Sequence, residues 1–560
     1  VTDGLTVAGN VSVDGGTIKL DGNYPVGTNN VALGNTALDS NVSGGQNTAI
    51  GSDALTANTA DDNTAVGWSA MSSNTTGSLN VAVGRSALSL NTTGSSNTAL
   101  GYAPLSNNTS GGSNVAIGRQ ALLSNTTASQ NTAVGYQSLY TNSTGVDNVA
   151  VGAFALNKNT TADDNTAIGY SALEQNTTGA SNSAVGHKAS EANTTGSDNS
   201  SLGMFALNRS TTGGSNTAIG KSALENNTTA SWNTAVGYQA GYSNTTGTQI
   251  TAIGRLALRS NTTGGYNIAV GNGALESNTT ASNNTAVGYQ AGYSNTTGLN
   301  ITALGRQALR YNTTGSYNTA VGLNALWSNT TGSNNTSMGE QALVNNTTAS
   351  NNTAVGYQAG YSNTTGTYLA ALGLANLYSN TTGTNNTAVS GRSALYYNTS
   401  GSYNTAVGNQ ALNSNTTASQ NTAVGYQAGY NSATSNNNTF LGYQAGRDIT
   451  GNNNTMLGSQ AGQLVTSGIK NTIVGLYNGN QGGLDIRTSS NNIVLSDGDG
   501  NPRVHVTSNG DMTLGEDIGT NAGYLLKLVA QGTVQLINRT GANGTAILFQ
   551  NDGVNVGSIS

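Results

Sequence analysis

Small apolar residues recur along this chain in a short phrase, Asn-Thr-Ala-Val-Gly or a close variant, which is repeated 27 times between Gly34 and Gly475. From Gly67 to Gly373, all 18 steps between the closing glycines are 17 residues long. A fixed period held over most of a chain is typical of stacked repeats, in which each repeat is one structural unit that packs on its neighbours. The pattern therefore predicts a solenoid shaft over residues 30–479.

The period is too short for helical repeats, because tetratricopeptide, ankyrin and HEAT units need about 33 residues or more for their paired helices. Seventeen residues suit two short strands and two tight corners. The sequence therefore predicts an all-β fold, a β-solenoid (β-roll) of 17-residue coils. Stacked strands lie about 4.8 Å apart, so the repeats predict a rod on the order of 130 Å long.

Within each coil, counted from the Asn of the phrase as position 1, position 3 is usually Ala and position 4 is Val, Ile, Leu or Met in nearly every coil. Neighbouring residues of a strand point to opposite faces, so these two positions place apolar atoms on both faces. One face can fill the thin interior of its own coil, and the other needs cover, most simply from an identical chain. We therefore expect a homotrimer with these strands near its axis. A monomeric solenoid with a modest apolar stripe is the alternative.

The corners of the coil are predicted from Gly, Asn and Thr. Gly at position 5 suits a tight corner that requires positive φ, and Asn-Thr-Thr-Gly or Asn-Thr-Thr-Ala at positions 12 to 15 forms the second corner. Position 1 is Asn in 24 of the 27 coils, which predicts a ladder of stacked amides. Many of the Asn-Thr-Thr triplets are formal glycosylation sequons, but we interpret them as corner residues.

Position 9 is usually Leu, with Gly in seven coils. Tyr directly follows Gly241, Gly292, Gly360 and Gly429, and the coils after the first three have Ile250, Ile301 and Leu369 in place of the position-1 Asn. Losing a core Leu without compensation costs about 2–5 kcal/mol. We therefore expect the Tyr ring and the larger aliphatic side chain to fill the space, which predicts that Tyr242 and Ile250 touch.

The outer edge of the coil carries most of the charges, at positions 6, 7 and 10, together with aromatic residues at position 6. These aromatics are Trp68, Tyr102, Tyr136, Tyr170, Tyr238, Tyr289 and Tyr357. We expect them to cover the side chain of the adjacent coil; stacking on sugars is the alternative.

Composition narrows the function classes. Only 8% of the residues are charged and the formal net charge is −6, with a pI near 4.9, so no basic patch is expected to bind nucleic acid. The chain has no Cys, and no apolar run approaches the roughly 20 residues of a membrane helix. The chain starts at Val1 without a secretory leader, as expected of a processed or truncated chain.

Candidate catalytic chemistry is sparse. The two histidines, His187 and His505, are far apart in sequence and are expected to be structural. The segment Asp-Gly-Asp-Gly-Asn at residues 497–501 lacks the closing Glu of a calcium loop and is interpreted as a turn. No nucleophile elbow, phosphate-binding loop or zinc-protease motif occurs. The sequence therefore predicts no enzyme, with no catalytic, cofactor-binding or metal-binding residues.

The ends of the chain differ from the repeats. Residues 1–29 are predicted to form an N-terminal β cap or joint, and residues 480–560 a separate C-terminal β module. The spacing is irregular from Gly51 to Gly67, from Gly373 to Gly391 and from Gly442 to Gly458, which predicts bulged coils, with Ser390 as an insertion in the second.

The repeated phrase resembles the head repeats of trimeric autotransporter adhesins, whose related motif builds a left-handed β-roll in each of three chains, although those repeats are typically shorter. The N-terminal segment LTVAGNVSVDGGTIKLDGNYPVGTNNVALG and the final NDGVNVGSIS resemble bacteriophage tail-fibre shafts matured by an endosialidase-type intramolecular chaperone. The resemblance implies a matured shaft, since that self-cleaving module is absent from this sequence.

The sequence thus predicts a structural, trimeric fibre that is extracellular or part of a virion, as in a phage tail fibre with a host-attachment tip. The expected partners are identical chains, end-to-end neighbours and a host surface glycan or receptor, with neither nucleic acid nor membrane insertion. A subunit of a bacterial extracellular filament or adhesin is the alternative. Ice binding through Thr ladders is a third class, disfavoured because the Thr-Thr pairs lie beside a corner.

Overall fold

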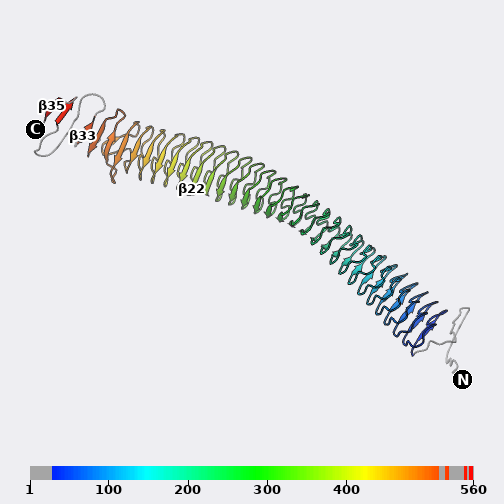
Figure 1. Cartoon of the computed structure of the whole chain (residues 1–560). Helices are drawn as coiled ribbons and strands as arrows, with labels where there is room; N and C mark the ends of the chain where they lie inside the picture. Colours follow the sequence, from blue (N-terminus) through cyan, green and yellow to red (C-terminus); the bar gives the residue numbers. More distant parts are fainter. Residues whose placement is uncertain (1–27, 516–523, 529–547, 552–553, 559–560) are drawn as a thin grey trace, which may run out of the picture. The chain divides into compact units, whose positions relative to one another are not determined.

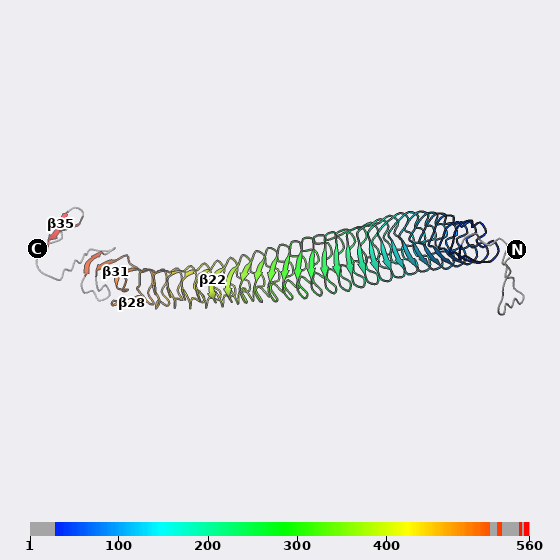
Figure 2. The same ribbon diagram turned by 90° about the horizontal axis from the view of Figure 1, so that it is seen from below.

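The computed structural model describes residues 28–515, 524–528, 548–551 and 554–558. The described residues contain strands and turns but no helix, so the chain is all-β, a β-solenoid of about 27 turns (Figures 1 and 2). The chain divides into two compact units, Val1–Ile301 and Thr302–Ser560, called unit 1 and unit 2 below. The predicted cap at residues 1–29 lies almost wholly outside the described residues.

Unit 1 contains 16 strands of three residues each. They are β1 (Val31–Leu33), β2 (Thr48–Ile50), β3 (Thr64–Val66), β4 (Val81–Val83), β5 (Thr98–Leu100), β6 (Val115–Ile117), β7 (Thr132–Val134), β8 (Val149–Val151), β9 (Thr166–Ile168), β10 (Ser183–Val185), β11 (Ser200–Leu202), β12 (Thr217–Ile219), β13 (Thr234–Val236), β14 (Thr251–Ile253), β15 (Ile268–Val270) and β16 (Thr285–Val287). Consecutive strands pair in parallel and in register, so that each coil position faces the same position of the next coil.

Unit 2 continues the pattern with 11 further coil strands. They are β17 (Thr302–Leu304), β18 (Thr319–Val321), β19 (Thr336–Met338), β20 (Thr353–Val355), β21 (Ala370–Leu374), β22 (Thr387–Arg392), β23 (Thr405–Val407), β24 (Thr422–Val424), β25 (Thr439–Leu441), β26 (Thr455–Leu457) and β27 (Thr472–Val474).

The end of unit 2 changes from parallel to antiparallel pairing. The remaining strands are β28 (Asn480–Gln481), β29 (Leu484–Asp485), β30 (Ile493–Ser496), β31 (Pro502–Val506), β32 (Met512–Gly515), β33 (Tyr524–Leu528), β34 (Leu548–Asn551) and β35 (Val554–Ser558). β30 pairs in parallel with β27, and β31, β32 and β33 follow it in antiparallel order. The parallel ladder therefore extends one strand beyond the predicted boundary at residue 479.

Each regular coil has one strand, at positions 2 to 4, and the prediction of two strands per coil is wrong. The second half of the coil consists of turns because positions 7 and 9 adopt left-handed backbone conformations, with φ of 53° at Ser69 and 48° at Met71. These turns still bond from coil to coil. The N–H of Ser69 donates to the carbonyl of Ser52 at 2.9 Å, and that of Met71 donates to Ala87 at 3.0 Å. The buried backbone is thus satisfied without a second sheet.

The interior of the coil is thin and is built from small side chains. Ala at positions 3 and 8 and Leu at position 9 are fully buried, as Ala82, Ala87 and Leu88 illustrate. The glycine at position 5 has a positive φ, and a Cβ added to Gly67 would lie 2.5 Å from the carbonyl oxygen of Gly84. Glycine is therefore required at this corner by both conformation and space, as predicted.

The three irregular coils have two different structures. Between Gly373 and Gly391 the pairing of β21 with β22 shifts register, which confirms a bulge at the inserted Ser390. The coils that end at Gly67 and Gly458 keep their strand register, so the bulges predicted there are wrong. In the coil that follows the one ending at Gly51, the corner at Asn58 is one residue shorter. The amide of Asn58 therefore donates to the carbonyl of Ala60, two residues later, where the other asparagine corners have a separation of three.

Candidate interaction surfaces

Two ladders of asparagine amides lie inside the coil stack. At position 1, the backbone N–H of Asn97 donates to Asn80 Oδ1 at 2.9 Å, and its Nδ2 donates to the same oxygen at 3.1 Å. At position 12, Asn91 Nδ2 donates to Asn74 Oδ1 at 2.7 Å. The first ladder confirms the prediction. The second was missed, although the signal was present in the fixed spacing of the Asn-Thr-Thr triplets.

The sequon asparagines belong to this second ladder. Asn74 and Asn91 are fully buried, and the Asn91 amide also donates to the carbonyl of Gly94 at 2.9 Å, which closes the corner. The following Thr92 donates its hydroxyl to the carbonyl of Thr109 in the next coil at 2.9 Å. These bonds support the interpretation of the triplets as corner residues. They also occupy the first Thr hydroxyl of the pair, whereas the second, such as Thr76, is exposed.

The compensation predicted at position 9 holds for the aliphatic side chain. Ile250 is fully buried, and its Cδ1 lies 3.6 Å from where a Cβ on Gly241 would stand. Ile301 Cδ1 lies 3.6 Å from the corresponding point at Gly292. Tyr242 is half-buried, and its contact with Ile250 stays a prediction.

Near the end of the repeats the same space is filled from position 3. A Cβ on Gly446 would lie 2.3 Å from Phe440, and one on Gly462 would lie 2.5 Å from the sulfur of Met456. Phe440 and Met456 replace the usual position-3 Ala and are fully buried. This exchange was not predicted, although in both coils a large residue at position 3 accompanies the glycine at position 9.

The outward face of the strands carries an apolar row at position 4 beside a row at position 2 that is Thr or Ser in 21 of the 27 coil strands. Position 3 points into the coil, and positions 2 and 4 point out, as predicted from strand alternation. Position-4 side chains such as Ile168, Leu202 and Ile219 in unit 1 are 39–49% exposed, and Met338 and Leu441 in unit 2 are 42% and 45% exposed. No position 2 or 4 of the 27 coil strands carries a charged residue. We call this surface the strand face.

The aromatic residues of position 6 mostly contact the adjacent coils. The guanidinium of Arg85 lies 4.9 Å from the ring centre of Trp68 and 5.7 Å from that of Tyr102. Further along, Tyr170 stacks on His187 at 5.3 Å. Since these ring faces are covered by neighbours of the same chain, the contacts support the covering role over sugar stacking.

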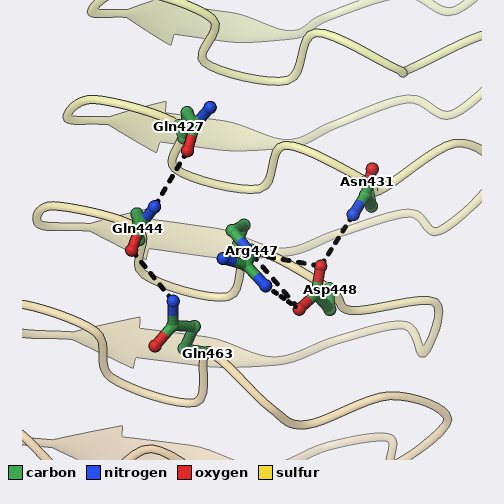
Figure 3. Close-up of polar contacts among 6 residues, drawn as sticks. All are labelled: Gln427, Asn431, Gln444, Arg447, Asp448 and Gln463. Atoms are coloured by element: carbon green, nitrogen blue, oxygen red, sulfur yellow. Dashed lines mark hydrogen bonds and ion pairs between the residues drawn. The ribbon is translucent and has the colours of Figure 1, made fainter.

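Polar side chains of unit 2 also bond along the stack (Figure 3). Gln444 Nε2 donates to Gln427 Oε1 and Gln463 Nε2 donates to Gln444 Oε1, both at 2.9 Å. Beside them Arg447 and Asp448 form an ion pair of 2.8 Å, and Asn431 donates to Asp448 at 2.7 Å (Figure 3). Every charge in this group has a partner within the chain, so the group stabilises the stack and offers no unpaired acid or base.

The two histidines have structural surroundings. His187 is exposed on the outer edge and takes part in ring contacts with Tyr170 and Phe205. His505 is nearly buried, with Nε2 3.0 Å from Asn492 Oδ1, and burial lowers its pKa. The two histidines belong to different units.

The segment 497–501 forms the turn between β30 and β31, as predicted. Burial acts to raise the pKa of Asp497, but hydrogen bonds from Arg503 and Asn501 outweigh it and lower the pKa to about 2. Arg503 pairs with Asp497 at 2.6 Å, so a cation at this carboxylate would have to displace the guanidinium.

Within the part of the chain that the structure describes, no group of three or more His, Cys, Asp and Glu residues could hold a metal ion. The same residues include no helix with the length and hydropathy needed to cross a membrane.

No protein-family model matches this chain, and neither a curated protein nor a solved structure is significantly similar to it.

Proposed function

We propose that this chain is the shaft of a structural fibre, assembled as a homotrimer through the strand face. The observation that carries the proposal is the unbroken row of apolar position-4 side chains on a face that has no charged residue at position 2 or 4 of the 27 coil strands. Surface strands of a monomer usually carry polar residues on their outward face, so a continuous outward row of Val, Ile and Leu at position 4 favours burial against a partner.

The extent of the strand face agrees with an interface. With about 4.8 Å between strands and about 7 Å between positions 2 and 4, the strip covers about 500 Å² in unit 1 and about 330 Å² in unit 2. Each strip is smaller than the roughly 800 Å² that one partner buries in a standard protein interface, so the proposed trimer requires both units to take part.

An identical chain is the partner that best fits this surface. Position-4 side chains repeat at the spacing of the coils, and a second stack of the same coils repeats at the same spacing. A trimer also agrees with the resemblance of the repeats to trimeric autotransporter adhesin heads. The resemblance of the termini to phage tail fibres favours an extracellular or virion location with host attachment through a glycan or receptor, and with no catalytic role. A subunit of a bacterial extracellular filament or adhesin, joined end to end, is the alternative.

Multi-angle light scattering of the purified chain, together with electron microscopy, tests the proposal. We expect a particle mass of three 56.2-kDa chains. The triple variant Ile168→Lys/Leu202→Lys/Ile219→Lys should lower the mass to that of one chain, because three charges of each chain would be buried between the strand faces. The matched control Leu79→Lys alters an exposed side chain off the strand face and should stay trimeric. A single-chain mass for the unaltered protein would contradict the trimer, and open-ended filaments would favour the alternative.

A further inference from the structure

A second surface, on the outer edge of unit 1, differs from the rest of the stack in charge. Between Asp62 and Asp147 the chain has no Asp, Glu, Lys or His, and its only charged residues are Arg85 and Arg119. The protein as a whole has a net charge of −6, so this run of coils is a local positive region on an acidic molecule. Both arginines occupy position 6 and are exposed.

The two guanidinium groups are held in place by aromatic rings. Arg85 lies between Trp68 and Tyr102, at 4.9 and 5.7 Å from the ring centres, and Arg119 lies between Tyr102 and Tyr136, at 5.7 and 5.8 Å. Stacking of this kind fixes the guanidinium plane and leaves its N–H edge toward solvent. Among the described residues neither arginine has a carboxylate partner, so their donors remain open to an external acceptor.

We propose that Arg85 and Arg119, with the three rings beside them, bind an extended acidic polysaccharide that runs along the coils. Guanidinium groups pair well with carboxylate and sulfate oxygens, and the tyrosine hydroxyls beside them add donors and acceptors for sugar hydroxyls. The surface is separate from the strand face, so this inference stands whether or not the chain forms a trimer.

The spacing of the two arginines favours a sparsely charged polymer. They are two coils apart, or about 9.6 Å along the stack. A nucleic-acid strand carries a charge about every 3.4 Å and would meet too few cations on this edge. Base stacking is also disfavoured, since both faces of the Tyr102 ring have an arginine over them. An acidic polysaccharide has fewer charges per unit length and binds through its edge groups.

Binding of the full-length chain to immobilised polygalacturonate and dextran sulfate tests the proposal, with neutral dextran and a single-stranded oligodeoxynucleotide as comparisons. We expect binding to one or both acidic glycans and none to neutral dextran. The double variant Arg85→Gln/Arg119→Gln should bind at least about tenfold more weakly, since a hydrogen bond to a charged group contributes about 1.5–3 kcal/mol. Arg209→Gln, an exposed arginine of the same unit, is the matched control and should bind like the unaltered protein.

The circular dichroism and melting temperature of each variant show whether it is folded. If the double variant does not fold, the salt dependence of glycan binding by the unaltered protein tests the proposal instead. Binding through two exposed cations should be lost near 1 M salt, because the screening length there is about 3 Å. Any of four results would overturn the proposal: no binding to either acidic glycan, salt-independent binding, equal binding by a folded double variant, or tighter binding to the oligonucleotide.

Discussion

Single side chains in this protein act mainly as hydrogen-bond partners for polar groups that would otherwise be unpaired in the stack. The position-1 amide ladder shows this at its end. The backbone N–H of Asn492 donates to Asn471 Oδ1 at 2.9 Å, and among the described residues no later asparagine continues this ladder. The remaining oxygen, Asn492 Oδ1, is met instead by His505 Nε2 at 3.0 Å from the antiparallel strand β31. His505 therefore ends the ladder, a role that its position in the sequence did not indicate.

This role predicts an acid-sensitive end of the solenoid. Burial lowers the pKa of His505 below its ordinary value of 6.5, so the unfolded chain takes up the proton at a higher pH than the folded chain. The stability contributed by neutral His505 is fully present above pH 6.5 and is lost as the pH falls through the lowered pKa. Hydrogen exchange of β30 and β31 should accelerate over that range. His505→Gln keeps a donor for Asn492 and should remove most of this pH dependence; an unchanged profile in the variant would contradict the assignment.

Among the structural elements, the bulge in β22 shows how the stack tolerates an insertion. Ser390 is the extra residue, and Asn376 replaces the usual position-8 Ala beside it. Ser390 Oγ donates to Asn376 Oδ1 at 2.7 Å, and the N–H of Ala394 donates to the same oxygen at 2.8 Å. The insertion and the buried amide therefore occur as a pair, because each satisfies the polar groups of the other.

Because Ser390 and Asn376 are hydrogen-bonded to each other, the effects of changing both residues on stability should not be additive. Deletion of Ser390 restores the 17-residue spacing but removes a partner of the buried Asn376, which should cost about 1–3 kcal/mol in local stability. Combining the deletion with Asn376→Ala recreates an ordinary coil and should recover most of that loss. Hydrogen exchange of β21 and β22 in the two single variants and the combined variant measures the coupling. Additive changes in stability would show that the Asn376 amide does not interact with the bulge at Ser390.

In the molecule as a whole, the same coil is repeated, so the free energy of folding is distributed over the contacts between neighbouring coils. Each coil contacts its two neighbours through the same backbone bonds, the same two amide ladders and the same small core. Proteins of this kind gain or lose whole repeats without changing the packing of the others.

Removal of one complete coil should therefore be tolerated. Deleting residues 148–164 joins Asp147 to Asn165, the first residue of the next coil, so register and both ladders continue. We expect the shortened chain to fold with a β-type circular dichroism spectrum and a melting temperature within a few degrees of the parent. Deleting residues 148–155 instead removes half a coil and should misplace the corner glycines and both amide ladders. Equal stability of the two deletions would contradict a stack whose contacts depend on coil register.

Much of the fold follows from the periodic sequence. The period predicts the all-β solenoid, the position of each strand at Ala and Val, the corner glycine and the first amide ladder, because the same residue recurs wherever the same position faces its copy in the next coil. The aliphatic replacements at Ile250 and Ile301 were also predictable, since they accompany the missing Leu at a constant offset.

The remaining features depend on contacts that a periodic pattern does not contain. The left-handed turns of positions 7 and 9 replace the second expected strand, because their backbone bonds form only when coils are stacked. Asn376 pairs with Ser390, and His505 ends the amide ladder, each through a neighbour that sequence spacing alone does not identify. For Arg85 and Arg119 the repeat predicted only that position-6 aromatics cover a neighbouring side chain, and the structure adds that each guanidinium lies between the rings of two adjacent coils.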